Sequence, residues 1–263
     1  MSDKPIIDIS KFNTVKSWSA VANNVNGVIM RLGYTGYGSG TIGRDPRFES
    51  HLAGCKNNNI PYGIYYFPAS VNEIEAAKEA EFILNSIKSF GLNLSFPIFL
   101  DSEIAETKNK SGRADKLDRN TRTRLLMRIC EILHEAGYHV GVYASKSWFA
   151  NNLDENQIYT YVYKWVAQYN TSCTYQGIYH LWQYTSGGII TGIEGRVDCS
   201  KLVRDMPTGL IADTVNHEPE PIPAPSPEPE PIKEARRAET MNIDVYDQYG
   251  ERMTGWTLKY NCY

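Results

Sequence analysis

Two acidic residues at alternate positions end the most informative segment of the sequence. Residues 96–103 read Phe-Pro-Ile-Phe-Leu-Asp-Ser-Glu, an apolar run that predicts a buried strand ending in Asp101 and Glu103. Side chains alternate faces along a strand, so the two carboxyl groups point the same way. Two neighbouring carboxyl groups whose environments separate their pKa values can cleave a glycosidic bond. The alternative is a strand that ends in ordinary solvated acids before a polar loop.

The elements that must position this pair alternate along residues 1–207. Helical periodicity covers residues 45–58, 71–90 and 120–136. The strands are expected at residues 6–9, 27–32, 62–67, 96–100, 139–143, 163–167 and 180–183. Strands that alternate with helices predict βαβ units and a parallel sheet. So many units in about 200 residues favour a closed α/β barrel of the TIM type. Helical patterns thin out in the last third, so we expect the barrel to be irregular there.

Polar and aromatic residues recur where these strands end. Reacting groups of parallel α/β barrels gather at the carboxyl ends of the strands. Four acids occupy such positions, namely Asp8, Asp101, Glu103 and Asp198. The other candidates for the same mouth are Arg31, Tyr34, Tyr65, Phe67, Tyr143, Trp165, Tyr169, Trp182 and Gln183. The sequence therefore predicts an acidic cluster ringed by aromatic side chains.

Each of these residues also has a structural interpretation. Asp8 could cap a turn or pair with Arg31, and Asp198 could be a turn acid. Three aromatic residues could belong to the core: Tyr65, Phe67 and Tyr143. Asp45 and Asp205 fall outside the strand-end pattern, and we interpret them as capping or surface groups.

Composition argues against several classes of protein. The net charge of −3 and the lack of a Lys/Arg block disfavour nucleic-acid binding. The histidines and the five cysteines show no metal-ligand spacing or disulfide framework, so we expect no metal and no cofactor. Cys55 and Cys130 lie in helix-like patterns and read as buried thiols. The segment 36–40 (Gly-Tyr-Gly-Ser-Gly) lacks the context of a phosphate loop and reads as a mobile loop. The sequence has no Gly-x-Ser-x-Gly elbow, so serine hydrolase chemistry is disfavoured.

The chain changes character near Pro207. Residues 217–232 alternate Pro and Glu, which predicts an extended spacer within a linker at residues 208–238. Residues 239–263 alternate polar and apolar side chains around a Tyr-Gly-Glu-Arg turn, which suggests a small hairpin. This tail could be part of a wall-binding module, a docking strand, or a segment that packs on the barrel. No stretch is long and apolar enough for a membrane span, and no apolar leader precedes the first strand.

The strand-end motifs together resemble the Chalaropsis-type lysozymes, family 25 of the glycoside hydrolases. The resemblance covers about residues 4–203, and it is specific because several motifs match in order and spacing. The matching segments are 8–10, 30–34, 45–48, 62–67, 100–103, 142–143, 165–169, 182–184 and 192–198. One departure is Tyr66, because many members of the family have His there; we expect it to face away from Tyr65 and Phe67.

The resemblance implies an irregular barrel with fewer helices than strands. It also implies cleavage of the β-1,4 bond between N-acetylmuramic acid and N-acetylglucosamine in bacterial peptidoglycan. Glu103 would be the general acid. Asp101 would stay ionised and assist attack by the substrate's own 2-acetamido group, with retention of configuration, and Asp8 and Asp198 would complete the cluster.

The linker-and-tail layout favours a phage endolysin, made in the host cytoplasm and acting on the wall after release. A bacterial autolysin and a secreted lysozyme remain open, as does the oligomeric state. Two other functions are a non-catalytic glycan-binding barrel, which would not need the acids, and an N-acetylglucosaminidase of the same fold.

Overall fold

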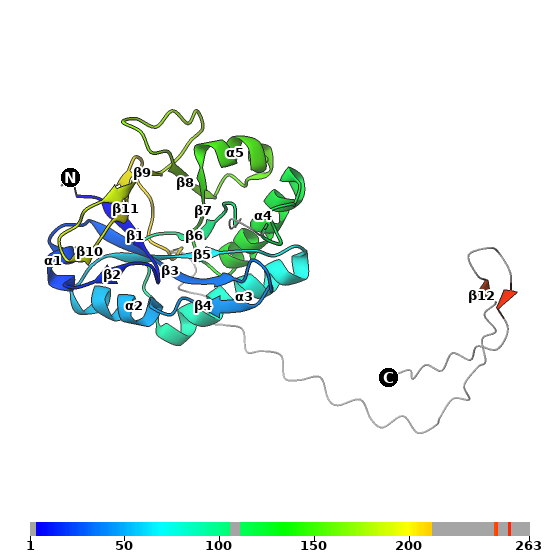
Figure 1. Cartoon of the computed structure of the whole chain (residues 1–263), viewed down its shortest axis with the longest axis horizontal. Helices are drawn as coiled ribbons and strands as arrows, with labels where there is room; N and C mark the ends of the chain where they lie inside the picture. The colour runs from blue at the N-terminus through cyan, green and yellow to red at the C-terminus, as the bar shows by residue number, and fades with distance from the viewer. Residues whose placement is uncertain (1–3, 106–110, 212–244, 247–251, 254–263) are drawn as a thin grey trace, which may run out of the picture. The chain divides into compact units, whose positions relative to one another are not determined.

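The computed structural model describes residues 4–105 and 111–211, together with the strand pairs 245–246 and 252–253. Within the first two ranges, eight strands close into a barrel in the order β1-β11-β9-β8-β7-β6-β5-β3, and β3 pairs with β1 to complete the ring (Figure 1). The barrel strands are β1 (Ile6–Ile9), β3 (Gly27–Thr35), β5 (Tyr62–Phe67), β6 (Ile98–Asp101), β7 (Val140–Ser145), β8 (Tyr163–Ala167), β9 (Leu181–Gly188) and β11 (Val197–Leu202). The strand β11 runs antiparallel to both β1 and β9, whereas the other neighbours are parallel.

The helices are unevenly distributed around this barrel. They are α1 (Trp18–Ala22), α2 (Phe48–Asn57), α3 (Glu73–Phe90), α4 (Arg119–Glu135), α5 (Lys146–Asn152) and the short 3-10 helix η1 (Glu155–Gln157). No helix lies between β8 and β9, or between β9 and β11, in these fully described connections. The prediction of an irregular α/β barrel with fewer helices than strands is therefore confirmed.

The two long helices begin and end at sequence signals. Asn72 caps α3 by accepting a hydrogen bond from the backbone N–H of Glu75, and Asp118 caps α4 in the same way. The helix α3 ends at Gly91, whose φ of +53° is the left-handed conformation that glycine adopts without a Cβ clash. These caps fix where each helix leaves the strand before it.

Apolar side chains form one layer inside the barrel and another between barrel and helices. The inner group consists of Ile6, Ile29, Phe99, Trp165 and Leu181. Their neighbours in sequence point outward, because faces alternate along each strand. A Cβ at Gly141 would lie 2.4 Å from the Phe99 ring, so this position of β7 accommodates only glycine. The inner apolar layer forms the floor under the polar strand ends.

Several short elements were not predicted. The strand β4 (Ile42–Arg44) pairs antiparallel with β3, so the segment 36–40 is the loop of a β-hairpin, closed by a hydrogen bond from Gly36 N to Thr41 O at 2.8 Å. The strands β2 (Thr14–Val15) and β10 (Ile193–Glu194) form a separate small pair. The helix α5 starts directly after β7, where the Ser145 hydroxyl accepts from the N–H of Trp148.

The expected boundary at residue 207 is too early. Gly209 N donates to Leu94 O, His139 N donates to Gly209 O, and Tyr138 forms a β-bridge with Leu210. Composition changes before these last backbone contacts, so the barrel unit continues at least to residue 211.

The chain divides into two compact units, Met1–Asn216 and His217–Tyr263. In the second unit, β12 (Val245–Tyr246) pairs antiparallel with β13 (Arg252–Met253). Residues 212–238 of the expected linker and the remainder of the expected tail lie outside the described residues. Among the described helices, none is long and apolar enough to cross a membrane.

Candidate active site

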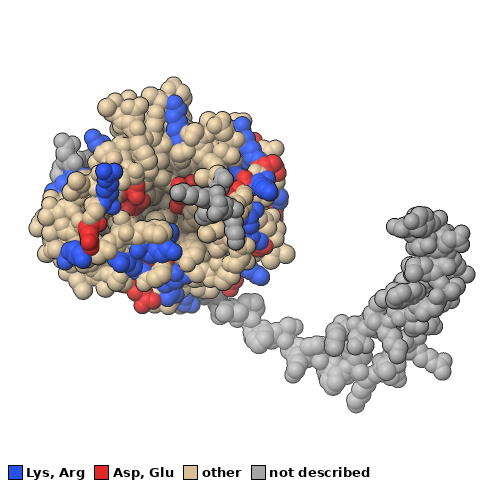
Figure 2. Space-filling view, viewed as in Figure 1, with Lys and Arg blue, Asp and Glu red and all other residues tan. Residues whose placement is uncertain are grey.

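A cavity of about 440 Å³ opens at the carboxyl ends of the parallel strands. Figure 2 shows this face of the molecule hollowed at its centre, with acidic side chains inside the hollow. The cavity is lined by Asp8, Ser10, Lys11, Phe12, Arg31, Tyr34, Thr35, Tyr37, Tyr65, Phe67, Asp101, Glu103, Ile104, Ala105, Tyr143, Trp165, Tyr169, Gln183 and Asp198. Every candidate residue from the sequence is in this set except Trp182.

Trp182 lies outside the cavity because it precedes Gln183 on the same strand. Neighbours in a strand face opposite sides, and Gln183 takes the inward position. The Trp182 indole N–H donates to the carbonyl of Gln168 at 2.8 Å, and its ring packs edge-on against Tyr184. The structure therefore does not support the predicted substrate contact for Trp182.

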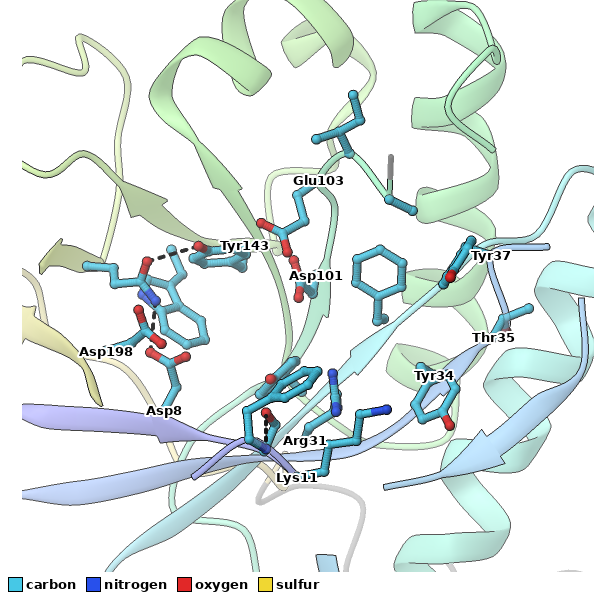
Figure 3. A pocket seen from close by; sticks show the side chains of 18 of the residues that line it. Asp8, Lys11, Arg31, Tyr34, Thr35, Tyr37, Asp101, Glu103, Tyr143 and Asp198 are labelled. Atoms are coloured by element: carbon cyan, nitrogen blue, oxygen red, sulfur yellow. Dashed lines mark hydrogen bonds between the residues drawn. The ribbon is translucent and has the colours of Figure 1, made fainter. Parts of the chain in front are cut away.

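The four acids come from β1, β6 and β11 and the loop that follows β6. Asp8 and Asp198 are directly opposite each other in the antiparallel β1–β11 pair. Asp101 ends β6, and Glu103 lies two residues further on, so both carboxyl groups reach the same space (Figure 3). Asp8 and Asp101 are buried, Asp198 is half-buried and Glu103 is open to solvent. The predicted convergence of four acids is present in the structure.

Asp101 has an unsatisfied acceptor. The residue is only 8% exposed, and its Oδ1 is buried without a hydrogen-bond partner among the described residues. A buried carboxylate oxygen without a donor is costly, so such atoms are rare in folded proteins. Asp101 lines the cavity, so a ligand N–H or O–H could bond to its carboxyl group.

Burial and mutual repulsion shift the pKa values of the buried acids. Burial raises the pKa of Asp8 well above its usual range, and the charge of Asp198 raises it further. Burial likewise raises the pKa of Asp101, followed by the charges of Glu103 and Asp8, while Arg31 lowers it. The sequence interpretation kept Asp101 ionised. In the structure, desolvation instead raises the pKa of Asp101 and favours its neutral form.

Glu103 shows the shift that a general acid needs. Desolvation within the cleft raises its pKa, and the charge of Asp198 raises it further, although the side chain keeps contact with solvent. The pKa of Asp198 is itself raised by burial. A cluster in which every carboxyl pKa is raised retains protons at a pH where isolated carboxyl groups lose them.

Aromatic side chains hold the cluster and wall the cavity. The hydroxyls of Tyr143 and Tyr169 both donate to Gln183 Oε1, at 2.9 and 3.0 Å. Gln183 Nε2 in turn donates to Asp8 Oδ2 at 2.9 Å. Trp165 is buried beneath them, with its indole N–H donating to Ser200 Oγ at 3.0 Å and its ring packed against Tyr143. Tyr169 is 58% exposed and presents its ring at the mouth.

The partner of Arg31 is Asp45, not Asp8. Arg31 Nε donates to Asp45 Oδ2 at 2.7 Å, and its Nη2 forms an ion pair with the same oxygen. Asp45 also accepts from the backbone N–H groups of Lys11 and Arg47. Asp45 is 2% exposed, so it is not a surface acid, and its hydrogen bond from the Arg47 N–H just before α2 is the local contact expected of a capping group. No local pattern indicated the pairing with Arg31, because Asp45 follows the short strand β4, which was not predicted.

Lys11, Phe12, Thr35 and Tyr37 also line the cavity and were not selected from the sequence. They lie in loops or beyond the expected strand ends, where the alternation used to select candidates does not apply. Their closeness in sequence to Asp8 and Tyr34 was the available signal. Within the described ranges, no group of three or more His, Cys, Asp or Glu side chains has a geometry that could hold a metal ion.

Comparison with known proteins decides the family. The sequence profile of the glycosyl hydrolases family 25 matches residues 7–193, well over half of the chain. The chain belongs to glycosyl hydrolase family 25. A search of curated proteins gave no match.

Solved structures show the same family 25 barrel. The modular autolysin LytC from Streptococcus pneumoniae is 35% identical, with a TM-score of 0.66 over 75% of this chain and 46% of LytC. The chain thus spans about half the length of LytC. The catalytic domain of endolysin Ply40 from bacteriophage P40 of Listeria monocytogenes is 28% identical, with a TM-score of 0.60 over 77% of this chain and 95% of that one. A lysozyme from Streptomyces coelicolor, 19% identical with a TM-score of 0.61 over 78% and 94% of the two chains, shares the fold.

The family 25 barrel also explains why Tyr66 is tolerated. Tyr66 is fully buried on the outer face of β5, where its hydroxyl lies 2.7 Å from Thr35 Oγ1. Tyr65 and Phe67, on the other face, line the cavity. The replacement at Tyr66 therefore changes the packing behind the barrel and leaves the groups in the cavity unchanged.

Proposed function

We propose that this family 25 barrel is an N-acetylmuramidase, which hydrolyses the β-1,4 bond between N-acetylmuramic acid and N-acetylglucosamine in bacterial peptidoglycan. The observation that carries the proposal is the placement of Glu103 and the unsatisfied Asp101 Oδ1 in one cavity. LytC, the most identical of the structures compared above, has also been solved in complex with a synthetic peptidoglycan ligand.

In the first step, Glu103 gives its proton to the glycosidic oxygen as the bond to the sugar C1 breaks. Its raised pKa supports this role, because the group must be protonated before it can act as an acid. The substrate's acetamido oxygen attacks C1 and closes an oxazolinium ring. The carboxylate of Asp101 stabilises the positive charge that develops on the acetamido nitrogen.

We expect the bound substrate to supply a hydrogen-bond donor to Asp101. An acetamido N–H placed against Oδ1 would donate a hydrogen bond to an oxygen that has no other partner in the described residues. A hydrogen bond to the charged form lowers a carboxyl pKa, as does a positive charge nearby. We infer that Asp101 ionises as substrate binds, and Arg31 acts in the same direction.

In the second step, Glu103 is a carboxylate and takes a proton from water as that water attacks C1. The oxazolinium ring opens, the acetamido group is restored, and Glu103 regains its proton. Two displacements at the same carbon give overall retention of configuration. Besides the chain and its substrate, these steps use only water.

Three variants test the proposal by the clearing of purified bacterial walls. Glu103→Gln is expected to lose nearly all activity because the amide has no proton to give. Asp101→Asn is expected to lose at least about 100-fold, the usual scale for removing a preorganised electrostatic partner. Glu81→Gln, an exposed substitution on α3 with the same change of charge, serves as the control. Near-normal clearing by a folded Glu103→Gln protein would contradict the assignment of the acid.

The products separate the muramidase from its alternatives. Borohydride reduction of the digest converts new reducing ends to sugar alcohols. Muramitol supports the proposal, whereas glucosaminitol would indicate an N-acetylglucosaminidase. A glycan-binding barrel without catalysis would yield neither.

We also infer that the protein acts in host cell lysis, on the wall, after release from the cytoplasm. The similarity to the catalytic domain of a phage endolysin supports this setting. Cytoplasmic expression in a susceptible host should leave cells intact until the membrane is permeabilised, and should then cause rapid lysis. Lysis without permeabilisation would count against release as the controlling step.

A further inference from the structure

Lys11 is an unneutralised cation at the rim of an acidic cavity. It lines the cavity together with the four carboxyl groups, and Figure 3 shows it on the side away from Asp198. Its Nζ has no carboxylate partner and no hydrogen bond among the described residues. The other cation of the cavity, Arg31, is paired with buried Asp45. Lys11 is therefore the lining cation that is available to a ligand in this part of the chain.

Lys11 has contacts both at its backbone and at its ammonium group. Its backbone N–H donates to Asp45 Oδ2 at 3.0 Å. Its Nζ lies 5.1 Å from the centre of the Phe12 ring and 5.6 Å from that of Tyr34. The Arg31 guanidinium lies 5.4 Å from the same two ring centres. Cations at these distances from aromatic faces are attracted to them, so the rings favour positions of the exposed ammonium beside Phe12 and Tyr34.

Phe12 makes this rim unusual for a protein surface. The residue is 78% exposed, although it lies at the mouth of the cavity. An exposed phenylalanine beside a positioned ammonium offers an apolar face and a positive charge side by side. A ligand that matches carries a carboxylate next to an apolar or sugar surface.

We propose that Lys11, Phe12 and Tyr34 form a subsite for a carboxylate-bearing substituent of the glycan. The proposal rests on the muramidase function and deepens it. N-Acetylmuramic acid differs from N-acetylglucosamine by a lactyl ether, whose carboxyl group is either free or joined to the stem peptide. The carboxylate bound by Lys11 is that of the lactyl group or of the stem peptide. Binding of this carboxylate distinguishes N-acetylmuramic acid from N-acetylglucosamine.

A competing role for Lys11 is to offset the charge of the acid cluster. The two roles differ in what they respond to. An offsetting charge would change the rate with every substrate and shift the pH profile. A carboxylate subsite would change KM, and only for substrates that carry the carboxylate.

The experiment compares hydrolysis of intact walls with hydrolysis of walls whose carboxyl groups have been converted to amides. Wild type should prefer the intact walls in kcat/KM. In Lys11→Gln this preference should fall by about fivefold, the scale of one partly exposed ion pair, and chiefly through KM. Lys11→Arg should keep most of it. Lys88→Gln is the matched control, because it is an exposed lysine in the last turn of α3 and does not line the cavity.

A third substrate distinguishes the two sources of the carboxylate. Walls stripped of stem peptides keep a free lactyl carboxylate, so a retained effect of Lys11→Gln indicates the lactyl group. An effect lost on stripped walls indicates the stem peptide. An equal loss on intact, stripped and amidated walls, or an altered pH profile without a change in selectivity, would overturn the subsite.

Failure of the muramidase function gives a different result. Wild type would then release no reducing ends that give muramitol from intact walls. In that case, binding of a muramyl-peptide fragment to the full chain, compared with its amidated form, still decides the subsite. Equal binding of the two forms by wild type would contradict it.

Discussion

Gln183 on β9 donates a hydrogen bond from Nε2 to Asp8 Oδ2 on β1 at 2.9 Å, across 175 positions of sequence. The same side chain accepts from two tyrosine hydroxyls through Oε1. Its N–H donor therefore faces Asp8 and its oxygen faces the two tyrosines. One amide thus positions both the carboxyl group and the tyrosine hydroxyls. The contact is possible because the barrel closes through β11, which separates β9 from β1 in the sheet.

Gln183→Leu should lower kcat/KM by about 10- to 100-fold. Loss of the amide leaves a buried Asp8 oxygen without its donor, which costs about 1–3 kcal/mol, and each step of about 1.4 kcal/mol is a factor of ten in rate. The measurement is reducing-end release from soluble glycan fragments. Gln176→Leu, an exposed substitution, is the control. Unchanged kinetics in a folded Gln183→Leu protein would show that the positioning of Asp8 is not needed.

Asp198→Asn should move the alkaline limb of the pH–activity profile to lower pH. The charge of Asp198 raises the pKa of Glu103, second only to desolvation. Activity falls as pH rises through that raised pKa, because Glu103 loses its proton there. Removing the charge lowers the pKa of Glu103, so activity is lost at a lower pH. Asp205→Asn removes an exposed charge outside the cavity and should leave the limb in place; a similar shift in both variants would argue against a local effect.

Asp45→Asn should lower the free energy of unfolding by about 3–5 kcal/mol, the usual cost of removing one member of a buried ion pair. Arg31 would then lie partly buried without a counter-charge. Denaturant unfolding measures the effect. Glu49→Gln is the comparison, because it breaks the exposed ion pair with Arg44 and should cost less than about 1 kcal/mol. Equal losses would mean that burial of the Arg31 pair does not matter.

Glu79→Gln should flatten the decline of stability with rising pH. Burial raises the pKa of Glu79 in the folded chain. The folded state therefore holds this proton more tightly than the unfolded state, and stability falls as pH rises from the ordinary glutamate pKa through the raised one. The amide keeps the acceptor that holds the Thr35 hydroxyl and the Ala69 N–H.

The measurement is the difference in unfolding free energy between variant and wild type at acidic and neutral pH. The variant should gain relative to wild type as pH rises. Glu75→Gln should do the opposite, because the hydrogen bond from Arg113 lowers the pKa of Glu75 and its stabilisation is lost as pH falls. A pH-independent difference for Glu79→Gln would indicate that Glu79 has the same pKa in the folded and unfolded protein.

Much of the barrel could be predicted from local patterns. The strands β1, β5 and β8 match the expected ranges, and α3 and α4 begin and end close to the predicted helices. These segments are long or strongly apolar, and their caps are local. The short elements β4, with three residues, and α5, with seven, were missed because segments of this length carry too little periodicity to be recognised. Their presence depends on pairing with β3 and on a single serine cap.

The sequence by itself determined which acids exist and that Asp101 and Glu103 share a face, because alternation along a strand is a local property. It also determined that Gln183 and Trp182 must point in opposite directions, but not which of them points inward. Only barrel closure decided that, since one position packs into the ring and the other packs outside it. The tertiary structure also decided that Asp45 pairs with Arg31, that Lys11 has no acidic partner among the described residues, and that every carboxyl pKa in the cluster is raised. These properties depend on burial and on charges from distant strands, which no local pattern contains.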